Sequence, residues 1–292
     1  MGLIGGSVAL ALKSNKVALA LKKAQGLNVV APLIVGVGRT QESLKEALNL
    51  SVIDTLETNI HKACSDADLI LIAAPVAQTA SILQSIKPHL NKQTIITDAG
   101  STKSDVLACA KEILGEQFSQ FVGGHPIAGA EKSGVTAAKE DLFLGKNVVL
   151  TPTTETNIHA VAGVAQFWKT CGANVSEMSA EDHDCIFAAV SHLPHLLAFA
   201  LVDEIASRPN AEQLFNFAAS GFRDFTRIAG SHPEMWRDIC LANKSALLSE
   251  LTAYQDELDQ LKQLLEHKDG AALQALFERA SMARNNWAQN KK

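Results

Sequence analysis

The sequence predicts an α/β protein with two domains, a parallel sheet with crossover helices followed by a domain made of helices. Two observations lead to this prediction. In the first half, short apolar runs alternate with segments of helical periodicity, the pattern of a sheet that helices cover on both faces. From Ala180 onward the pattern changes to long helices. We therefore expect domains of 1–178 and 179–292.

The expected strands are short and apolar, as buried parallel strands are. They are LIVGVG (33–38), DLILIAAPV (68–76), TIITDAG (94–100), FVGGHP (121–126), NVVLTP (147–152) and ANVSEMS (173–179). Parallel strands end at one edge of the sheet, where open α/β proteins bind ligands. Polar residues that directly follow these strands are therefore the first candidates for a functional site.

The chain opens with MGLIGGSVALALK, which matches the second half of a G-x-G-x-x-G turn. Such a turn seats a dinucleotide pyrophosphate on a helix N-terminus, so Gly2, Leu3, Ile4 and Gly5 are candidate cofactor-binding residues. The first glycine and the strand before it are absent from the sequence. We therefore expect a Rossmann-type sheet without its first strand. We also expect Met1 to be an internal residue of a natural chain with roughly ten more residues before it.

The end of the strand at 33–38 bears on the choice between NAD and NADP. A carboxylate there would bind the ribose hydroxyls of NAD and repel a 2′-phosphate, but Gly38 and Arg39 occupy the place. Gly38 leaves room for a phosphate, and Arg39 is either its cation or a solvated loop residue. The sequence leaves the preference between NAD and NADP open.

Composition excludes several classes of function. The net charge is −5 and the pI about 6.0, so we expect no nucleic-acid surface. The five cysteines show no C-x-x-C spacing, which favours reduced thiols in the cytoplasm. His192 and His195 are three apart in SHLPH, but no H-E-x-x-H pattern accompanies them, so we expect no metal site. We also expect no membrane-spanning segment.

Two loops after predicted strands carry the candidate catalytic residues. DAGSTK (98–103) and GGHPIAGAEKSG (123–134) should both project from the carboxyl edge of the sheet. His125 lies between Gly124 and Pro126, so its backbone is constrained and its ring accessible, as a general base requires. Ser101 and Glu131 should lie on the same edge.

The helical half contains a second candidate site and a candidate interface. GFRDFTRIAGSHPEMWRD (221–238) places arginines beside aromatic rings, a combination suited to a small carboxylated ligand with a ring. A helix that starts at Pro233 would carry an apolar seam at alternating spacings of four and three, made of Leu247, Leu251, Tyr254, Leu258, Leu261 and Leu265. This seam packs either against another helix of the same chain or against a second subunit.

Taken together, the motifs resemble the prephenate dehydrogenase family of tyrosine biosynthesis, which includes arogenate and cyclohexadienyl dehydrogenases. GLIGGS, DAGSTK, GGHPIAGAEKSG, SHLPH and FRDFTRIAGSHPEMWRD occur in this order, and the resemblance extends from Gly2 to about Leu265. It implies a Rossmann domain, an all-helical dimerisation domain and a homodimer. The implied reaction oxidises prephenate with NAD or NADP and releases carbon dioxide and 4-hydroxyphenylpyruvate.

The resemblance also implies roles for single residues. His125 matches the catalytic histidine, and Ser101 the serine that orients it. Arg227 matches an arginine that binds a substrate carboxylate. Further matches are His195 and Trp236 in the substrate pocket, Glu131 at the pocket entrance and Ser191 near the nicotinamide.

Three alternatives remain at this point. In the first, the substrate is arogenate, alone or together with prephenate. In the second, the chain is a β-hydroxyacid dehydrogenase, which would use a catalytic lysine in its helical domain. In the third, it is a non-catalytic nucleotide-binding relative. A histidine on a sheet-edge loop argues against the second alternative, and the presence of Ser101, His125 and Arg227 argues against the third.

Overall fold

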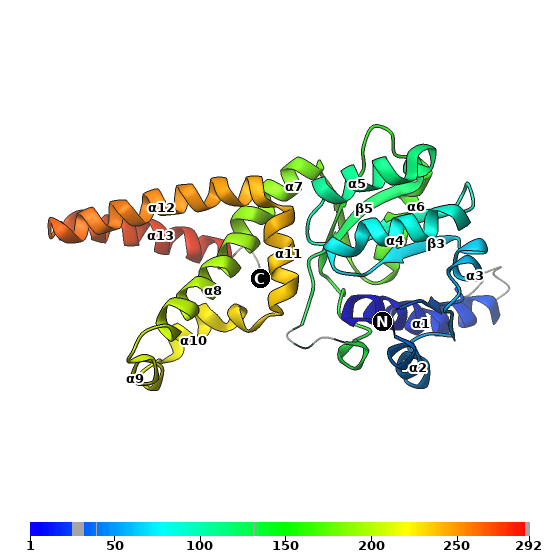
Figure 1. Cartoon of the computed structure of the whole chain (residues 1–292), viewed down its shortest axis with the longest axis horizontal. Coiled ribbons are helices and arrows are strands. Elements are labelled where there is room, and N and C mark those ends of the chain that lie inside the picture. The colour runs from blue at the N-terminus through cyan, green and yellow to red at the C-terminus, as the bar shows by residue number, and fades with distance from the viewer. Residues whose placement is uncertain (25–31, 39, 131, 133, 290–292) are drawn as a thin grey trace. The chain divides into compact units, whose positions relative to one another are not determined.

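A computed structural model describes residues 1–24, 32–38, 40–130, 132 and 134–289. The chain divides into two compact units, Met1–Lys244 and Ser245–Lys292. The first unit holds the whole sheet and all helices up to α11 (Figure 1). The boundary expected at 178 and 179 lies inside this unit and stays a prediction.

The main sheet has five strands in chain order: β3 (Leu69–Ile72), β4 (Ile95–Asp98), β5 (Phe121–Pro126), β6 (Asn147–Thr151) and β7 (Asn174–Glu177). A separate parallel pair is formed by β1 (Val35–Gly36) and β2 (Thr55–Leu56). All six predicted strands are therefore present. The sequence did not predict β2, which has only two residues.

One strand pairing differs from the predicted parallel sheet. β3, β4 and β5 are parallel, and so are β6 and β7, but β5 and β6 run antiparallel with His125 opposite Val149. A parallel return requires a crossover, usually a helix. The described residues between β5 and β6 contain only a short 3₁₀ turn at Val135–Ala137, so the chain turns back instead.

Helices cover both faces of the main sheet (Figure 1). On one face, α4 (Thr79–Ile86) and α5 (Ser104–Leu114) form a core with Ile96 and Phe121 of the strands. On the other face, α1 (Leu3–Ala24) and α6 (Ile158–Thr170) form a second core around Trp168. Because helices bury both faces of the main sheet, a ligand-binding site has to lie at the ends of its strands. Two smaller helices, α2 (Gln41–Asn49) and α3 (Ile60–Ser65), flank the β1–β2 pair and the sheet.

The first unit continues in a series of helices. These are α7 (Ala180–Phe187), a π-helical turn (Ala188–His192), α8 (Leu193–Ala206), α9 (Ala211–Asn216), α10 (Ser220–Thr226), a 3₁₀ turn (Arg227–Gly230) and α11 (Pro233–Ala242). The Ser179 hydroxyl caps α7 by accepting a hydrogen bond from the backbone of Asp182. Pro194 occupies the first turn of α8, directly after the π-helical turn.

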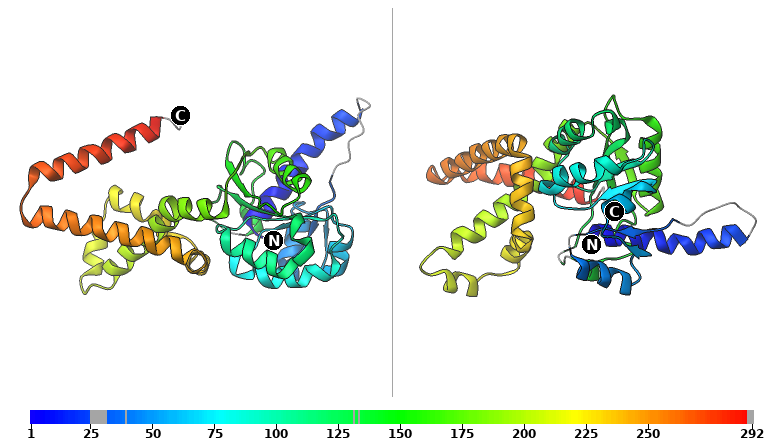
Figure 2. Two further views of the ribbon diagram at one scale, coloured as in Figure 1. Left: turned by 90° about the horizontal axis from the view of Figure 1, so that it is seen from above. Right: turned by 45° about the vertical axis from the view of Figure 1, so that its right-hand side comes forward.

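The expectation of one continuous helix from Pro233 through the leucine seam is wrong in one respect. It is broken at Asn243, between α11 and α12 (Lys244–Glu266). The Asn243 side chain is turned inward, where it bonds the carbonyl of Asp184 and Nδ1 of His192. In the second unit, α12 and α13 (Gly270–Gln289) leave a short turn in different directions (Figure 2). Leu258 and Leu265 on α12 are exposed.

The expectation of no membrane-spanning segment rested on the absence of a long uncharged run, and that premise is wrong. Among the described residues, Ala180–Ala206 is long and apolar enough to cross a membrane, with a mean hydropathy of 1.9. Between Asp184 and Asp203, residues 185–202 include no Asp, Glu, Lys or Arg. Because His183 and His192 in this stretch are hydrogen-bonded inside the first unit, we interpret it as part of the folded domain.

Candidate active site

His125 lies at the carboxyl end of β5, next to the end of β4. The backbone N–H of Gly124 donates to a carboxylate oxygen of Asp98 at 2.9 Å. A side chain at position 124 would meet the backbone oxygen of Asp98 at 2.8 Å, so only glycine lets the two strands approach this closely. The backbone that presents His125 is thereby fixed at the sheet edge.

A buried ion pair supports this strand end from beneath. The Lys103 ammonium is bonded to the carboxylate of Asp98, and the side chains are 0% and 2% exposed. The same ammonium donates to the carbonyl of Gly124 at 2.9 Å. The loop DAGSTK thus contributes Asp98 and Lys103 as groups that hold the residue before His125 in place.

The imidazole of His125 is hydrogen-bonded to a second histidine on α7. Nδ1 of His125 lies 2.8 Å from Nε2 of His183, whose Nδ1 lies 2.8 Å from a carboxylate oxygen of Asp184. His183 is fully buried, and Phe187 packs against both rings with centroids 4.9 and 4.5 Å away. The three polar groups form one continuous chain from the helix to the sheet edge.

The π-helical turn brings a third histidine to the same region. Nδ1 of His192 lies 3.1 Å from the amide nitrogen of Asn243, and His192 is buried. The backbone of Ser101 lies beside this ring and acts on its pKa. Ser101 is therefore in the site, although no hydrogen bond joins its hydroxyl to His125. The role of Ser101 in orienting His125 stays a prediction.

His195 and Trp236 lie next to His192, whose ring centroid is 6.2 Å from that of Trp236. The rings of His195 and Trp236 are stacked with centroids 3.6 Å apart and an angle of 17° between the planes. Nδ1 of His195 bonds the carbonyl of Ser191 one helical turn earlier. The indole N–H of Trp236 is buried without a hydrogen-bond partner among the described residues. A buried unpaired donor is costly, which suits a position that a bound ligand completes.

The histidines are held neutral. Burial, followed by the charges of His183 and Lys103, places the pKa of His125 well below the usual 6.5. Burial lowers the pKa of His192 to about 4. Burial also lowers the pKa of His195, and the nearby guanidinium of Arg227 acts in the same direction. A neutral His125 has a lone pair available, as a general base requires.

The glycine turn fits the phosphate end of a dinucleotide. α1 begins at Leu3 and has no acidic residue in its first turn. A side chain at Gly5 would meet Ala73, just after β3, at 3.4 Å, and one at Gly6 would meet Ala138 at 2.9 Å. The contact at Gly6 is closer than a side chain allows, whereas the one at Gly5 is an ordinary van der Waals distance. The assignment of Gly2, Leu3, Ile4 and Gly5 to a pyrophosphate stays a prediction.

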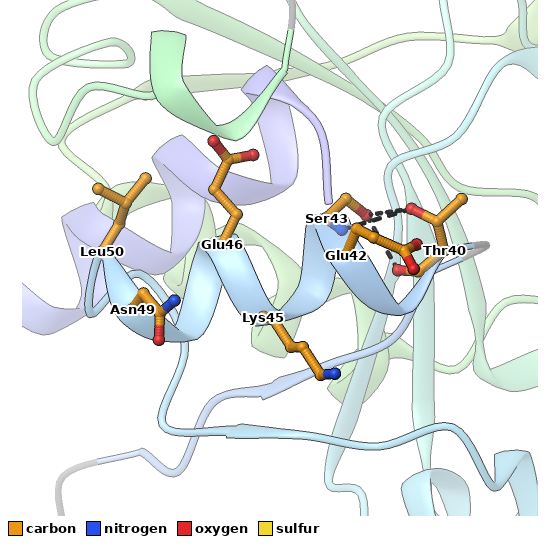
Figure 3. Close-up of a pocket in the computed structure, with 7 residues that line it drawn as sticks. All are labelled: Thr40, Glu42, Ser43, Lys45, Glu46, Asn49 and Leu50. Carbon is orange, nitrogen blue, oxygen red and sulfur yellow. Dashed lines mark hydrogen bonds between the residues drawn. The ribbon is translucent and has the colours of Figure 1, made fainter.

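Gly38 follows β1, in the segment that leads to α2. A side chain there would meet the backbone nitrogen of Met1 at 3.2 Å and Leu44 at 3.3 Å. Thr40 then caps α2, its hydroxyl accepting a hydrogen bond from the backbone of Ser43. Figure 3 shows the open depression along the outside of this helix. It is lined by Thr40, Glu42, Ser43, Lys45, Glu46, Asn49 and Leu50.

The structure places the sequence candidates unevenly. His125, Ser101, Ser191, His195, Trp236 and Arg227 are in the first unit, linked through the contacts above. Arg39 and Glu131 lie outside the described residues. The sequence analysis missed the roles of His183, Asp184 and Asn243. The adjacent His-Asp pair in a helix with a buried face was the signal that could have drawn attention to them.

No group of three or more potential metal-ligating side chains occurs among the described residues. The site therefore consists of a neutral imidazole at a sheet edge, a stacked His–Trp wall near an arginine, and a glycine turn at a helix N-terminus. These parts define a dehydrogenase of the dinucleotide-binding α/β class.

Comparison with known proteins identifies the family. The model of the prephenate dehydrogenase nucleotide-binding domain matches residues 17–177, and that of the prephenate dehydrogenase dimerization domain matches residues 179–279. The chain belongs to the prephenate dehydrogenase family.

Individual relatives agree with this assignment. The chain is 39% identical to a prephenate dehydrogenase of Bacillus subtilis over 96% of this chain and 72% of that protein. It is 35% identical to a cyclohexadienyl dehydrogenase of Zymomonas mobilis over 82% of this chain and 80% of that protein. The crystal structure of Aquifex aeolicus prephenate dehydrogenase with hydroxyphenyl propionate and NAD⁺ has a TM-score of 0.85 at 36% identity and covers 97% of this chain and 94% of that chain.

Proposed function

We propose that the chain oxidises prephenate to 4-hydroxyphenylpyruvate and carbon dioxide with a nicotinamide cofactor, as a step of tyrosine biosynthesis. The observation that carries this proposal is the neutral imidazole of His125, fixed at the sheet edge, with His192 between its surroundings and the stacked His195–Trp236 pair. The reaction needs one base and accurate positioning of a ring, and it needs no metal or covalent nucleophile.

In the mechanism, His125 takes the proton from the ring hydroxyl of prephenate. As the C–O bond becomes a carbonyl, the hydrogen on the same carbon leaves as hydride. The nicotinamide supplies the acceptor for this hydride. Cleavage of the ring carboxylate as carbon dioxide returns its electron pair to the ring, which becomes aromatic as the carbonyl oxygen regains a proton. His125 is the group that can return the proton it took.

Substrate binding falls to the residues of α8, α11 and the turn between α10 and α11. We assign Arg227 to a substrate carboxylate, because its cation lies near the stacked wall and acts on His195. His195 and Trp236 would contact the ring, with the unpaired indole N–H as a donor to an oxygen of the substrate. We propose that Ser101 orients both the substrate hydroxyl and the imidazole of His125. Ser191 would lie near the nicotinamide, and Glu131 at the entrance of the pocket.

For the cofactor, the residues from Gly2 to Gly5 would bind the pyrophosphate. We propose that NADP is accepted as well as NAD, because Gly38 carries no carboxylate to repel a 2′-phosphate and Arg39 follows it. Whether Arg39 reaches that phosphate is part of the proposal.

Prephenate and arogenate differ in a keto or an amino group on the side chain. A solved relative of 28% identity and a TM-score of 0.80 is an arogenate dehydrogenase of Synechocystis, and it covers 98% of this chain and 97% of that chain. We therefore include arogenate as a second substrate to be tested. We also propose a homodimer in the cytoplasm. The match to a dimerization domain supports the dimer, and the five free cysteines suit a reducing compartment.

The test is to measure reduced nicotinamide with prephenate and arogenate, each paired with NAD and NADP, and to identify the product by chromatography. Formation of 4-hydroxyphenylpyruvate from prephenate supports the proposal. Turnover of arogenate alone would replace the substrate, and no turnover of either compound with either cofactor would overturn the proposal. A β-hydroxyacid tested beside them distinguishes the other dehydrogenase class.

A further inference from the structure

The hydrogen-bonded chain from His125 through His183 to Asp184 has a direction. An ionised carboxylate only accepts hydrogen bonds. Asp184 accepts from the backbone N–H groups of Lys103 at 2.9 Å and Ser104 at 2.8 Å. These donors, with His183, lower the pKa of its carboxyl to about 2 in spite of burial, so the group is ionised at neutral pH.

The charge of Asp184 decides where each proton lies. Nδ1 of His183, 2.8 Å from the carboxylate, must carry a hydrogen. Neutral His183 then has a bare Nε2, which can only accept. Its partner 2.8 Å away, Nδ1 of His125, must therefore be the donor. This leaves Nε2 of His125 without a hydrogen.

We infer that His183 and Asp184 are positioning residues that hold His125 in its Nδ1–H tautomer, so that Nε2 is the atom that takes the substrate's proton. This inference rests on the proposed function, in which His125 is the base. It adds the identity of the basic atom and the two residues that set it.

Three features support a positioning role over a merely structural one. The hydrogen bond made by one ring nitrogen sets the tautomer of a histidine, and His125 has such a bond to a residue that cannot rotate freely. His183 is fully buried, and Phe187 lies against both rings. Asp184 is itself held by two backbone donors from the loop that follows β4.

The same chain supports the charge that forms during turnover. When Nε2 takes a proton, His125 becomes an imidazolium that still donates through Nδ1 to His183. Asp184 stabilises this charge through the intervening ring, while the Lys103 ammonium opposes it. The opposing charge keeps the proton mobile, because a base that binds its proton too tightly is slow to return it.

The direct test is the ¹⁵N spectrum of histidine-labelled protein near neutral pH, where protonated and bare ring nitrogens have distinct shifts. The signals of His125 are assigned as those lost in His125→Asn. We expect Nδ1 of His125 to be protonated and Nε2 to be bare. A proton on Nε2 of the wild-type protein would overturn the inference, whatever the activity with prephenate. Absence of turnover together with the expected spectrum would overturn the proposed function alone.

Variants at position 183 provide the second test. His183→Gln keeps an acceptor near the position of Nε2, whereas His183→Leu removes it. We expect His183→Leu to give a mixed tautomer spectrum and to lower kcat by about 10- to 100-fold with little change in KM, as loss of a residue that orients an imidazole does. His183→Gln should recover most of kcat and the Nδ1–H spectrum.

The surface pair His61 and His89 gives a matched control, because their ring nitrogens also lie close, at 3.2 Å, but outside the site. His61→Leu should leave kcat and the His125 signals unchanged. Equal loss of kcat in His183→Leu and His183→Gln, with an unchanged tautomer and an unchanged melting temperature, would contradict the inference.

Discussion

The ammonium group of Lys103 and the carboxylate of Asp98 are bonded to each other inside the fold, beneath the strand end that presents His125. Asp98 also accepts hydrogen bonds from the N–H groups of Gly100 and Gly124, and Lys103 also donates to the carbonyl of Gly124. Every polar atom of this pair that points inward is thus used to hold two neighbouring loops together. The Lys103–Asp98 pair therefore both stabilises the sheet edge and fixes the position of His125, the proposed base.

Removing one member of this pair should destabilise the protein strongly. Lys103→Met leaves the Asp98 carboxylate buried without its cation, and we expect the free energy of unfolding to fall by about 3–5 kcal/mol. The double variant Lys103→Met with Asp98→Leu removes both charges and should recover part of the loss. Denaturant titration measures both values. A loss below about 1 kcal/mol in the single variant would contradict a buried pair.

Replacing His125 tests the base. His125→Asn keeps a polar side chain but cannot take the proton, so kcat should fall by roughly 10²- to 10⁴-fold. Cofactor affinity, measured by fluorescence titration, should change little because the glycine turn is untouched. His159→Asn, on the exposed face of α6, is the matched control and should keep full activity. Near-normal turnover in His125→Asn would show that another group is the base.

Arg227 should matter for substrate and not for cofactor. Arg227→Ala should weaken prephenate binding by about 2–5 kcal/mol if the carboxylate is buried against it. Arg208→Ala is the control, since that guanidinium is 51% exposed and pairs with Glu204, which is itself 55% exposed. Initial rates over a range of prephenate concentrations give both KM values. An unchanged KM in Arg227→Ala would remove Arg227 from the carboxylate site.

The pH dependence of kcat/KM should follow the protonation of His125. Its pKa lies well below 6.5, so the ring is already neutral at pH 6.5 and stays neutral as the pH rises. We therefore expect kcat/KM to be level from pH 6.5 to neutral and to fall as the pH drops below 6.5, with the midpoint at the lowered pKa. A midpoint at or above 6.5 would indicate that His125 is not held neutral by its surroundings.

Gly38 should influence the choice of cofactor. Gly38→Asp adds a carboxylate near the 2′-position of the ribose, so kcat/KM for NADP should fall relative to NAD. A side chain at this position meets Met1 and Leu44 at 3.2 and 3.3 Å, so Gly38→Ala serves as the steric control. If both variants change the NADP to NAD ratio equally, crowding and not charge sets the preference. If the wild-type protein does not use NADP at all, the proposed role of Arg39 is wrong.

Much of the fold could be read from local patterns. The strands at 69–72, 95–98 and 121–126 are short apolar runs, and burial on both faces requires such runs. The direction of β6 depends on what the chain does between β5 and β6, where no helix forms among the described residues. A strand pattern contains no information on direction, so the antiparallel pair could not be predicted from it.

The site was predictable only in part, for a related reason. His125 and Ser101 directly follow strands, and the topology alone brings such residues to one edge. His183 and Asp184 reach the same place from a helix far along the chain, through contacts that no spacing encodes. Asn243 interrupts the helix just before the leucine pattern begins at Leu247, because its side chain forms tertiary hydrogen bonds to Asp184 and His192.

The π-helical turn at Ala188–His192 acts as a one-residue insertion in an otherwise α-helical path. Each residue added to a helix rotates everything after it by about 100°. The turn therefore sets the angular phase between α7, which carries His183 and Asp184, and α8, which carries His195. Deleting a single residue here would leave both helices intact and hydrogen-bonded, yet it would rotate His195 away from Trp236. The site is consequently sensitive to length at this position in a way that substitutions of the same residues would not reveal.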